Sequence, residues 1–220
     1  MNIFEKHEIF EIEVLEKLKN ARLLNPLVFG GGSMLRLCHE LNRYSVDLGF
    51  WQIKDTADNT LFDKIQDVVK QDYDITDAQM KHFTILIEIR SGGFPKRLKI
   101  EIRKEIQDWD FQEKIAYSKF SNKQVVLRAH TLEQTIENKI AALLERGEIR
   151  DSFDIEFLLR QGIQIPELSD ADRTKILARL DGFKTNDFKV KLGSILAKDI
   201  RTYYIENKFN YLKQKLELEE

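Results

Sequence analysis

Apolar and polar residues alternate in two different ways along this chain of 220 residues. In the first 130 residues, runs with a period of two are interleaved with runs that have the helical period. From Thr131 onward the helical period predominates. We therefore expect an α+β part in residues 1–130 and a helical part in residues 131–220.

Four apolar residues near the start recur at helical spacing and predict an amphipathic helix: Ile9, Ile12, Leu15 and Leu18. A second helix is predicted in residues 55–71, with Asp58 or Asn59 as its N-cap. In the helical part, Thr131 and Gly147 carry the start and stop signals of a helix. Further helices are predicted at 150–160, at 169–180 behind a Ser169 or Asp170 cap, and in one or two charged segments up to Glu220.

Runs of β-branched residues predict the strands of the first part. Residues 82–90 and 97–104 flank a turn at 91–95 and predict a hairpin, and residues 123–130 predict a further short strand. Two more strands are predicted at 26–29 and 46–52, on either side of a glycine-rich turn and a short helix.

The charge balance and the cysteine content indicate which partners and which cellular compartment to expect. The 35 basic and 37 acidic residues give a net charge of −2, which offers no global argument for nucleic-acid binding. Cys38 is the only cysteine, so no intramolecular disulfide can form and a reduced, cytoplasmic protein is expected. No apolar run is long enough to cross a bilayer, so no membrane partner is expected.

Candidate chemistry gathers in residues 29–51, FGGGSMLRLCHELNRYSVDLGFW. Three glycines between a strand and a helix predicted to open at Ser33 leave amide N–H groups that can bind phosphate. The alternative is a tight turn that needs positive φ, with Ser33 as the N-cap.

Two acids lie within apolar strands, Asp47 in the strand after this turn and Glu101 in LKIEIRK. Acids on two strands of one sheet could share a metal ion with a bound triphosphate. The alternative is a pair of ordinary salt bridges, from Asp47 to Arg43 or Lys54 and from Glu101 to Arg103.

A third cluster lies in the helical part, where Arg150, Asp151 and Asp154 form the pattern RDxxD and Lys139 lies on the preceding helix. Helix capping and an Arg150–Asp154 pair at i, i+4 explain this pattern without function. The functional interpretation makes Lys139 a phosphate contact.

Together these segments resemble the AbiEii/AbiGii toxin family, a branch of the DNA polymerase beta-like nucleotidyltransferases. The resemblance rests on GGS followed by RYSVDLGF, on the acidic strand LKIEIRK and on the lysine that precedes RDxxD. These motifs occur in the family's order within residues 27–159.

The resemblance implies an α+β fold with a polymerase-beta-like mixed sheet, followed by a helical part. It implies transfer of a nucleotide from Mg²⁺-bound NTP to an acceptor, which in relatives can be tRNA, and a cognate antitoxin as a further partner. The residues that it implies are Gly31, Gly32, Ser33, Arg43 and Lys139 for the nucleotide, Asp47 and Glu101 for catalysis and the metal, and Ser45, Arg150, Asp151 and Asp154 in support.

The chain departs from the family's D-x-D pair at Gly49, which cannot bind a metal. Alternate residues of a strand point to one face, so Leu48 cannot replace the missing ligand. Three explanations remain open: a catalytically inactive relative that still binds a nucleotide or a protein, a toxin disarmed by alteration, or rescue by Asp55 or Glu105.

Overall fold

The computed structural model describes residues 1–218, so the last two residues of the predicted charged terminus lie outside the described part. The chain forms two compact units. The first contains residues 1–40 and 44–131, and the second contains residues 41–43 together with the chain from Leu132 onward. Three residues within the N-terminal half therefore belong to the second unit.

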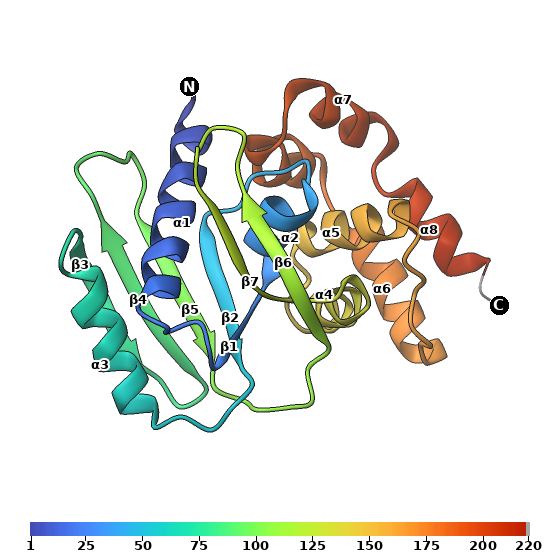
Figure 1. Cartoon of the computed structure of the whole chain (residues 1–220). Coiled ribbons are helices and arrows are strands. Elements are labelled where there is room, and N and C mark those ends of the chain that lie inside the picture. The colour runs from blue at the N-terminus through green and yellow to red at the C-terminus, as the bar shows by residue number, and fades with distance from the viewer. Residues whose placement is uncertain (219–220) are drawn as a thin grey trace. The chain divides into compact units, whose positions relative to one another are not determined.

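The first unit is built on a mixed sheet of seven strands in the order β3-β4-β5-β2-β1-β7-β6 (Figure 1). The pairs β1–β7 and β2–β5 are parallel and the other neighbours are antiparallel. This arrangement confirms the predicted α+β class with a mixed sheet. The strands are β1 (Leu27–Gly30), β2 (Asp47–Gln52), β3 (Asp74–Met80), β4 (Thr84–Arg90), β5 (Leu98–Arg103), β6 (Phe111–Tyr117) and β7 (Gln124–His130).

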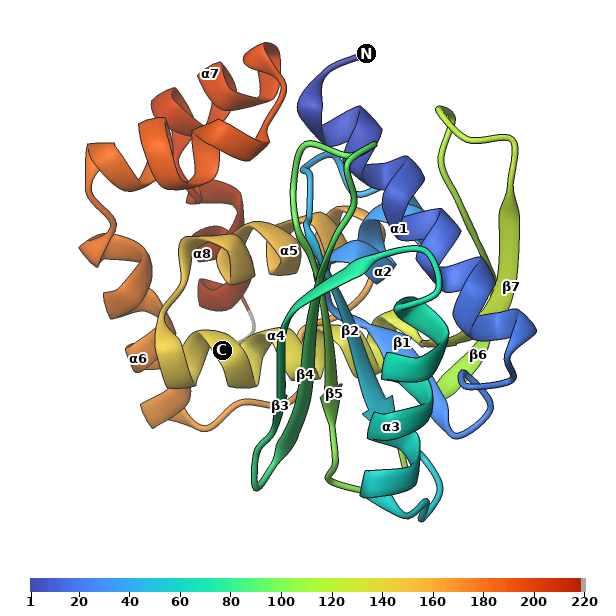
Figure 2. The ribbon, with the colours of Figure 1, turned by 90° about the vertical axis from the view of Figure 1, so that its left-hand side faces the viewer.

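Three helices complete this unit: α1 (Ile3–Asn20), α2 (Gly31–His39) and α3 (Asp58–Val69). The views in Figures 1 and 2 place α1 and α3 on the same face of the sheet. Helix α1 contacts α3, β5 and β7, and α3 contacts β3 and β4. Alternate residues of β4 and β5 are fully buried, which places one face of each strand in the core: Ile85, Ile87, Ile89, Leu98, Ile100 and Ile102.

The structure corrects several local predictions. Helix α2 begins at Gly31, two residues before the predicted start, and its N-cap is Gly30. The N-cap of α3 is Ala57, whose side chain cannot cap, and not Asp58 or Asn59. Strands β3 and β6, which form the two edges of the sheet, were not predicted.

The second unit is helical, as the sequence predicts. It contains α4 (Leu132–Arg146), α5 (Ile149–Arg160), α6 (Asp170–Gly182), the π-helical turn η1 (Asp187–Leu192), the 3₁₀ turn η2 (Gly193–Ile195), α7 (Lys198–Asn207) and α8 (Asn210–Glu217). Gly147 follows α4 with φ 67°, and the Ser169 side chain caps α6, so both of these predicted signals are confirmed. Helix α5 is the centre of this unit and contacts α4, α8 and η1. Within residues 1–218, no helix is both long and apolar enough to span a bilayer.

Candidate active site

The turn between β1 and α2 requires glycine at two positions for different reasons. A Cβ atom at Gly30 would lie 2.5 Å from the ring of Trp51, so packing fixes this residue. Gly31 has φ 76°, which strains other residues, and its Cβ position faces open space within 4 Å. The positive φ expected of a tight turn is therefore present. The first amide N–H groups of α2 have no partner within the helix and can bind an anion.

Ser33 lies inside the first turn of α2 and is not its N-cap. Its side chain is fully buried. The hydroxyl oxygen lies 2.7 Å from Oε1 of Glu11 on α1 and 2.7 Å from the main-chain oxygen of Asp47. The Ser33 side chain therefore connects α1, α2 and the first residue of β2, and only the main chain of Ser33 is left to bind phosphate.

Asp47 and Glu101 lie on adjacent parallel strands and point to the same face of the sheet. Asp47 is in register with Lys99, and Gly49, two residues on, is in register with Glu101. Asp47 is exposed and Glu101 is half-buried. Within residues 1–218 neither carboxylate forms an ion pair.

The alternative interpretation of these acids as salt bridges is wrong. Arg43 binds Asp154 instead of Asp47. The guanidinium of Arg103 lies 5.0 Å from the centre of the Trp51 ring. The two acids are thus available to a cation that the protein does not itself provide.

Gly49 lies between Gly30 of β1 and Glu101 of β5 in the register of the sheet. A Cβ atom at Gly49 would make only ordinary contacts, 3.5 Å from the Gly30 oxygen and 3.7 Å from the Trp51 ring. No steric demand therefore explains the glycine.

Asp55 and Glu105 follow the far ends of β2 and β5, so neither can replace a ligand beside Asp47. No cluster of three or more potential metal ligands exists in the described residues.

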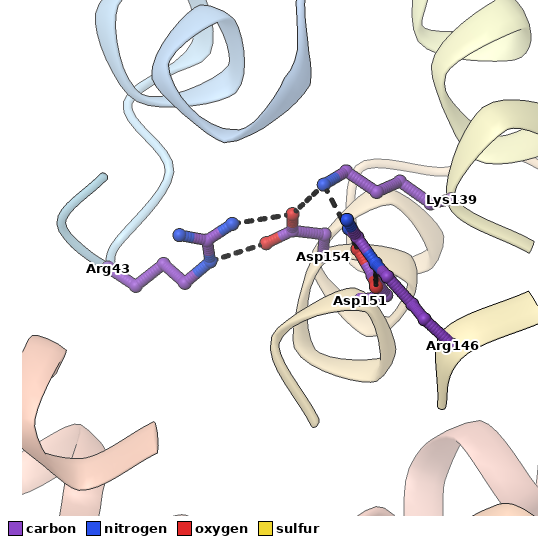
Figure 3. A network of polar contacts seen from close by, with 5 residues as sticks. All are labelled: Arg43, Lys139, Arg146, Asp151 and Asp154. Carbon is purple, nitrogen blue, oxygen red and sulfur yellow. Dashed lines mark hydrogen bonds and ion pairs between the residues drawn. The ribbon is translucent and has the colours of Figure 1, made fainter. Parts of the chain in front are cut away.

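The second unit contains a network of charged side chains around two buried acids, Asp151 and Asp154, shown in Figure 3. Arg43 donates two hydrogen bonds to Asp154, at 2.6 and 2.7 Å. Lys139 lies 2.6 Å from Asp154 and 3.3 Å from Asp151, and Arg146 donates twice to Asp151 at 2.8 Å. Asp154 is fully buried. Burial alone raises the pKa of Asp154, but the charges and hydrogen bonds of Arg43 and Lys139 outweigh it and hold that pKa below its ordinary value.

Four of the predicted site residues belong to this network, and two others, Arg150 and Ser45, do not. Arg150 is exposed, and Asp154 binds Arg43 and Lys139 in place of the predicted Arg150 partner. Ser45 lies in the segment before β2. Arg146 was not predicted, although its position in the last turn of α4, just before Gly147, allows it to reach the start of α5.

Glu11 is the other residue that the sequence interpretation missed. Its signal is present, because Glu8, Glu11, Leu15 and Leu18 follow one another at intervals of three and four residues. Two acids therefore occupy the apolar stripe of α1, and both are buried. Glu8 binds Arg36 at 2.7 Å.

Comparison with known proteins identifies the family. The family model described as nucleotidyl transferase AbiEii toxin of type IV toxin–antitoxin systems matches residues 13–212. The chain belongs to the AbiEii family. The predicted family is thereby confirmed, and so is its class of function, a nucleotidyltransferase of toxin–antitoxin systems.

Solved structures support the fold of this AbiEii protein. The crystal structure of JHP933 from Helicobacter pylori matches with a TM-score of 0.51 and 19% identity, covering 94% of each chain. MenT4, a nucleotidyltransferase toxin from Mycobacterium tuberculosis H37Rv, matches with a TM-score of 0.50 and 14% identity, covering 95% of this chain and 88% of that one. No curated protein matched the sequence. Membership of the AbiEii family implies an NTP substrate, and nucleotidyltransferases of this family typically use a divalent metal.

Proposed function

We propose that this AbiEii protein binds an NTP with Mg²⁺ at the start of α2 and at the two acids beside it. The observation that carries the proposal is the placement of Asp47 and Glu101. They lie on adjacent strands, face the same way and form no ion pair within residues 1–218. Asp47 is also the first residue of β2, and its main-chain oxygen accepts a hydrogen bond from Ser33 in the first turn of α2. The acid and the free amide groups of α2 therefore lie at the same end of the sheet.

The residues present fit one hard divalent cation. Mg²⁺ is commonly held by one or two carboxylates together with substrate phosphates, and Asp47 and Glu101 supply those carboxylates. When bound, the ion would offset the charge of the triphosphate. The main-chain N–H groups of Gly31, Gly32 and Ser33 would hold phosphate oxygens, because the Ser33 hydroxyl is already hydrogen-bonded inside the unit.

The reaction proposed is nucleotide transfer to a hydroxyl of an RNA acceptor, slowed by the glycine at position 49. A carboxylate at this position would lie in register with Glu101 and on the face of Asp47, where it could bridge two metal ions. Gly49 also favours a second candidate function, an inactive relative that binds nucleotide or antitoxin without transfer. The two functions share the binding site and differ in turnover.

The roles proposed for the second unit are supporting ones. Lys139 is held by Asp151 and Asp154, and Arg43 by Asp154, so both cations already have carboxylate partners. Contact of Arg43 or Lys139 with the triphosphate stays a prediction, as does the supporting role of Ser45 and of exposed Arg150. The network of Figure 3 fixes α4, α5 and the residue Arg43 to one another.

The direct test is isothermal titration of the protein with each of the four NTPs in the presence of Mg²⁺. We expect binding that Asp47→Asn and Glu101→Gln abolish. Absence of heat at millimolar nucleotide would refute the proposed site.

Gly49→Asp separates the two candidate functions. We expect the variant to transfer labelled nucleotide to RNA faster than the wild type and to be more toxic to host cells. Gly92→Asp is the matched control, because it adds the same charge in the exposed β4–β5 turn, where a Cβ atom meets nothing within 4 Å. If Gly49→Asp binds Mg-NTP but remains silent in both assays, the inactive-relative function is the correct one.

A further inference from the structure

Within residues 1–218, Glu11 is a buried acid that forms no ion pair. Its side chain is fully buried, and the nearby Arg36 binds Glu8 instead. Of its two oxygens, Oε1 contacts the Ser33 hydroxyl, and buried Oε2 has no hydrogen-bond partner in the described residues. An ionised carboxylate in such a position is costly because neither a charge nor enough hydrogen bonds replace the lost water.

The Ser33 hydroxyl gives an independent argument about whether Glu11 carries a proton. Its oxygen is 2.7 Å from both Glu11 and the main-chain oxygen of Asp47, which is the ordinary length of an O–H···O hydrogen bond. A hydroxyl has one hydrogen, and a main-chain carbonyl can only accept. Ser33 therefore donates to Asp47, and the hydrogen in the other contact must come from Glu11.

We propose that Glu11 is held as the neutral acid and acts as a positioning residue for the nucleotide site. Its O–H donates to Ser33, which donates to the main-chain oxygen of Asp47. These two hydrogen bonds fix the first turn of α2 against the first residue of β2. The positioning role rests on the proposed function, because the two hydrogen bonds join the phosphate-binding turn to Asp47, the acid proposed to bind the metal.

The surroundings of Glu11 agree with this state. Burial is the largest influence and raises the pKa of Glu11 well above its ordinary value. The charges of Glu8 on α1 and Asp47 on β2 raise it further, whereas Arg36 on α2 lowers it. A hydrogen bond donated by Ser33 to the carboxylate would also lower the pKa, but Ser33 donates its hydrogen to Asp47.

Infrared difference spectroscopy of the whole protein tests the protonation directly. We expect the carbonyl band of a protonated carboxyl at pH 7 in the wild type and in Glu13→Gln, a control on the same helix, and its loss in Glu11→Gln. Absence of the band from the wild type would overturn the proposal. This measurement needs no nucleotide, so it remains decisive if Mg-NTP binding fails and the proposed function is refuted.

Titration with Mg-NTP tests the positioning role. Glutamine keeps a donor to Ser33, so Glu11→Gln should bind within about twofold of the wild type, whereas Glu11→Ala should bind on the order of tenfold more weakly. Equal weakening in both variants would show that the donated hydrogen bond does not position the site. If Glu11→Ala does not fold, retained affinity in Glu11→Gln supports the role and lost affinity overturns it.

Discussion

Removal of the charge of Asp154 is the most direct test of the charged network in the second unit, because two buried cations bind this carboxylate. We propose the substitution Asp154→Asn, which keeps the shape of the side chain and removes its charge. Arg43 and Lys139 then lose the negative charge of their shared partner and one of its two acceptor oxygens, and their side chains are only 4% and 9% exposed.

Removal of one partner from a buried ion pair costs about 3–5 kcal/mol, because the remaining charge stays desolvated. Lys139 keeps its contact with Asp151 at 3.3 Å, so we expect the cost to lie near the middle of this range, about 4 kcal/mol. With a denaturant slope of about 3 kcal/mol per M, the urea midpoint should fall by about 1.3 M. Hydrogen exchange should show lost protection in α4 and α5.

The matched control is Asp181→Asn in α6, which removes the same charge from a carboxylate that is 71% exposed and paired with Lys213. We expect it to change the free energy of unfolding by less than about 1 kcal/mol. The reasoning is refuted if both asparagine variants have the same midpoint. A double-mutant cycle with Arg43→Ala adds a second check, since the effects of the two substitutions should not add.

Two further predictions concern the first unit. Gly30→Ala should lower the free energy of unfolding by about 1–3 kcal/mol, because its Cβ would lie 2.5 Å from the Trp51 ring, and Gly49→Ala should be much milder; equal urea midpoints would contradict this reasoning. The raised pKa of Glu11 means that the folded state binds a proton that the unfolded state releases above about pH 4.3. The stability of the wild type relative to Glu11→Gln should therefore fall as the pH rises from that value to the raised pKa, by up to about 1.4 kcal/mol per pH unit, and a pH-independent difference in urea titrations would count against it.

Local patterns predicted the strands that are buried and failed at the edges. β4 and β5 have alternating β-branched residues on a core face, and both were predicted from that alternation. β3 and β6 lie at the two edges of the sheet and are mostly exposed or half-buried. Hydrogen bonds to one neighbouring strand determine their conformation, and a single sequence does not show that pairing.

The candidate site was predictable where it depends on the period of a strand. Asp47 and Glu101 were assigned to one sheet from their positions in apolar runs, and the register places them on one face. The contacts of Ser33 with Glu11 and of Arg43 with Asp154 span 22 and 111 residues. Such contacts arise from tertiary packing, so the sequence patterns favoured a local cap for Ser33 and a local pair for Asp154.

The place of Arg43 in the chain has a practical consequence for dissection of the protein. Leu41–Arg43 are flanked on both sides by the first unit, yet they belong to the second, where Arg43 neutralises a fully buried acid. A recombinant fragment that begins at Leu132 would lack this internal piece of its own fold. Truncation experiments should therefore supply Leu41–Arg43 in trans, as part of a fragment that ends at Thr131, in the manner of a split protein.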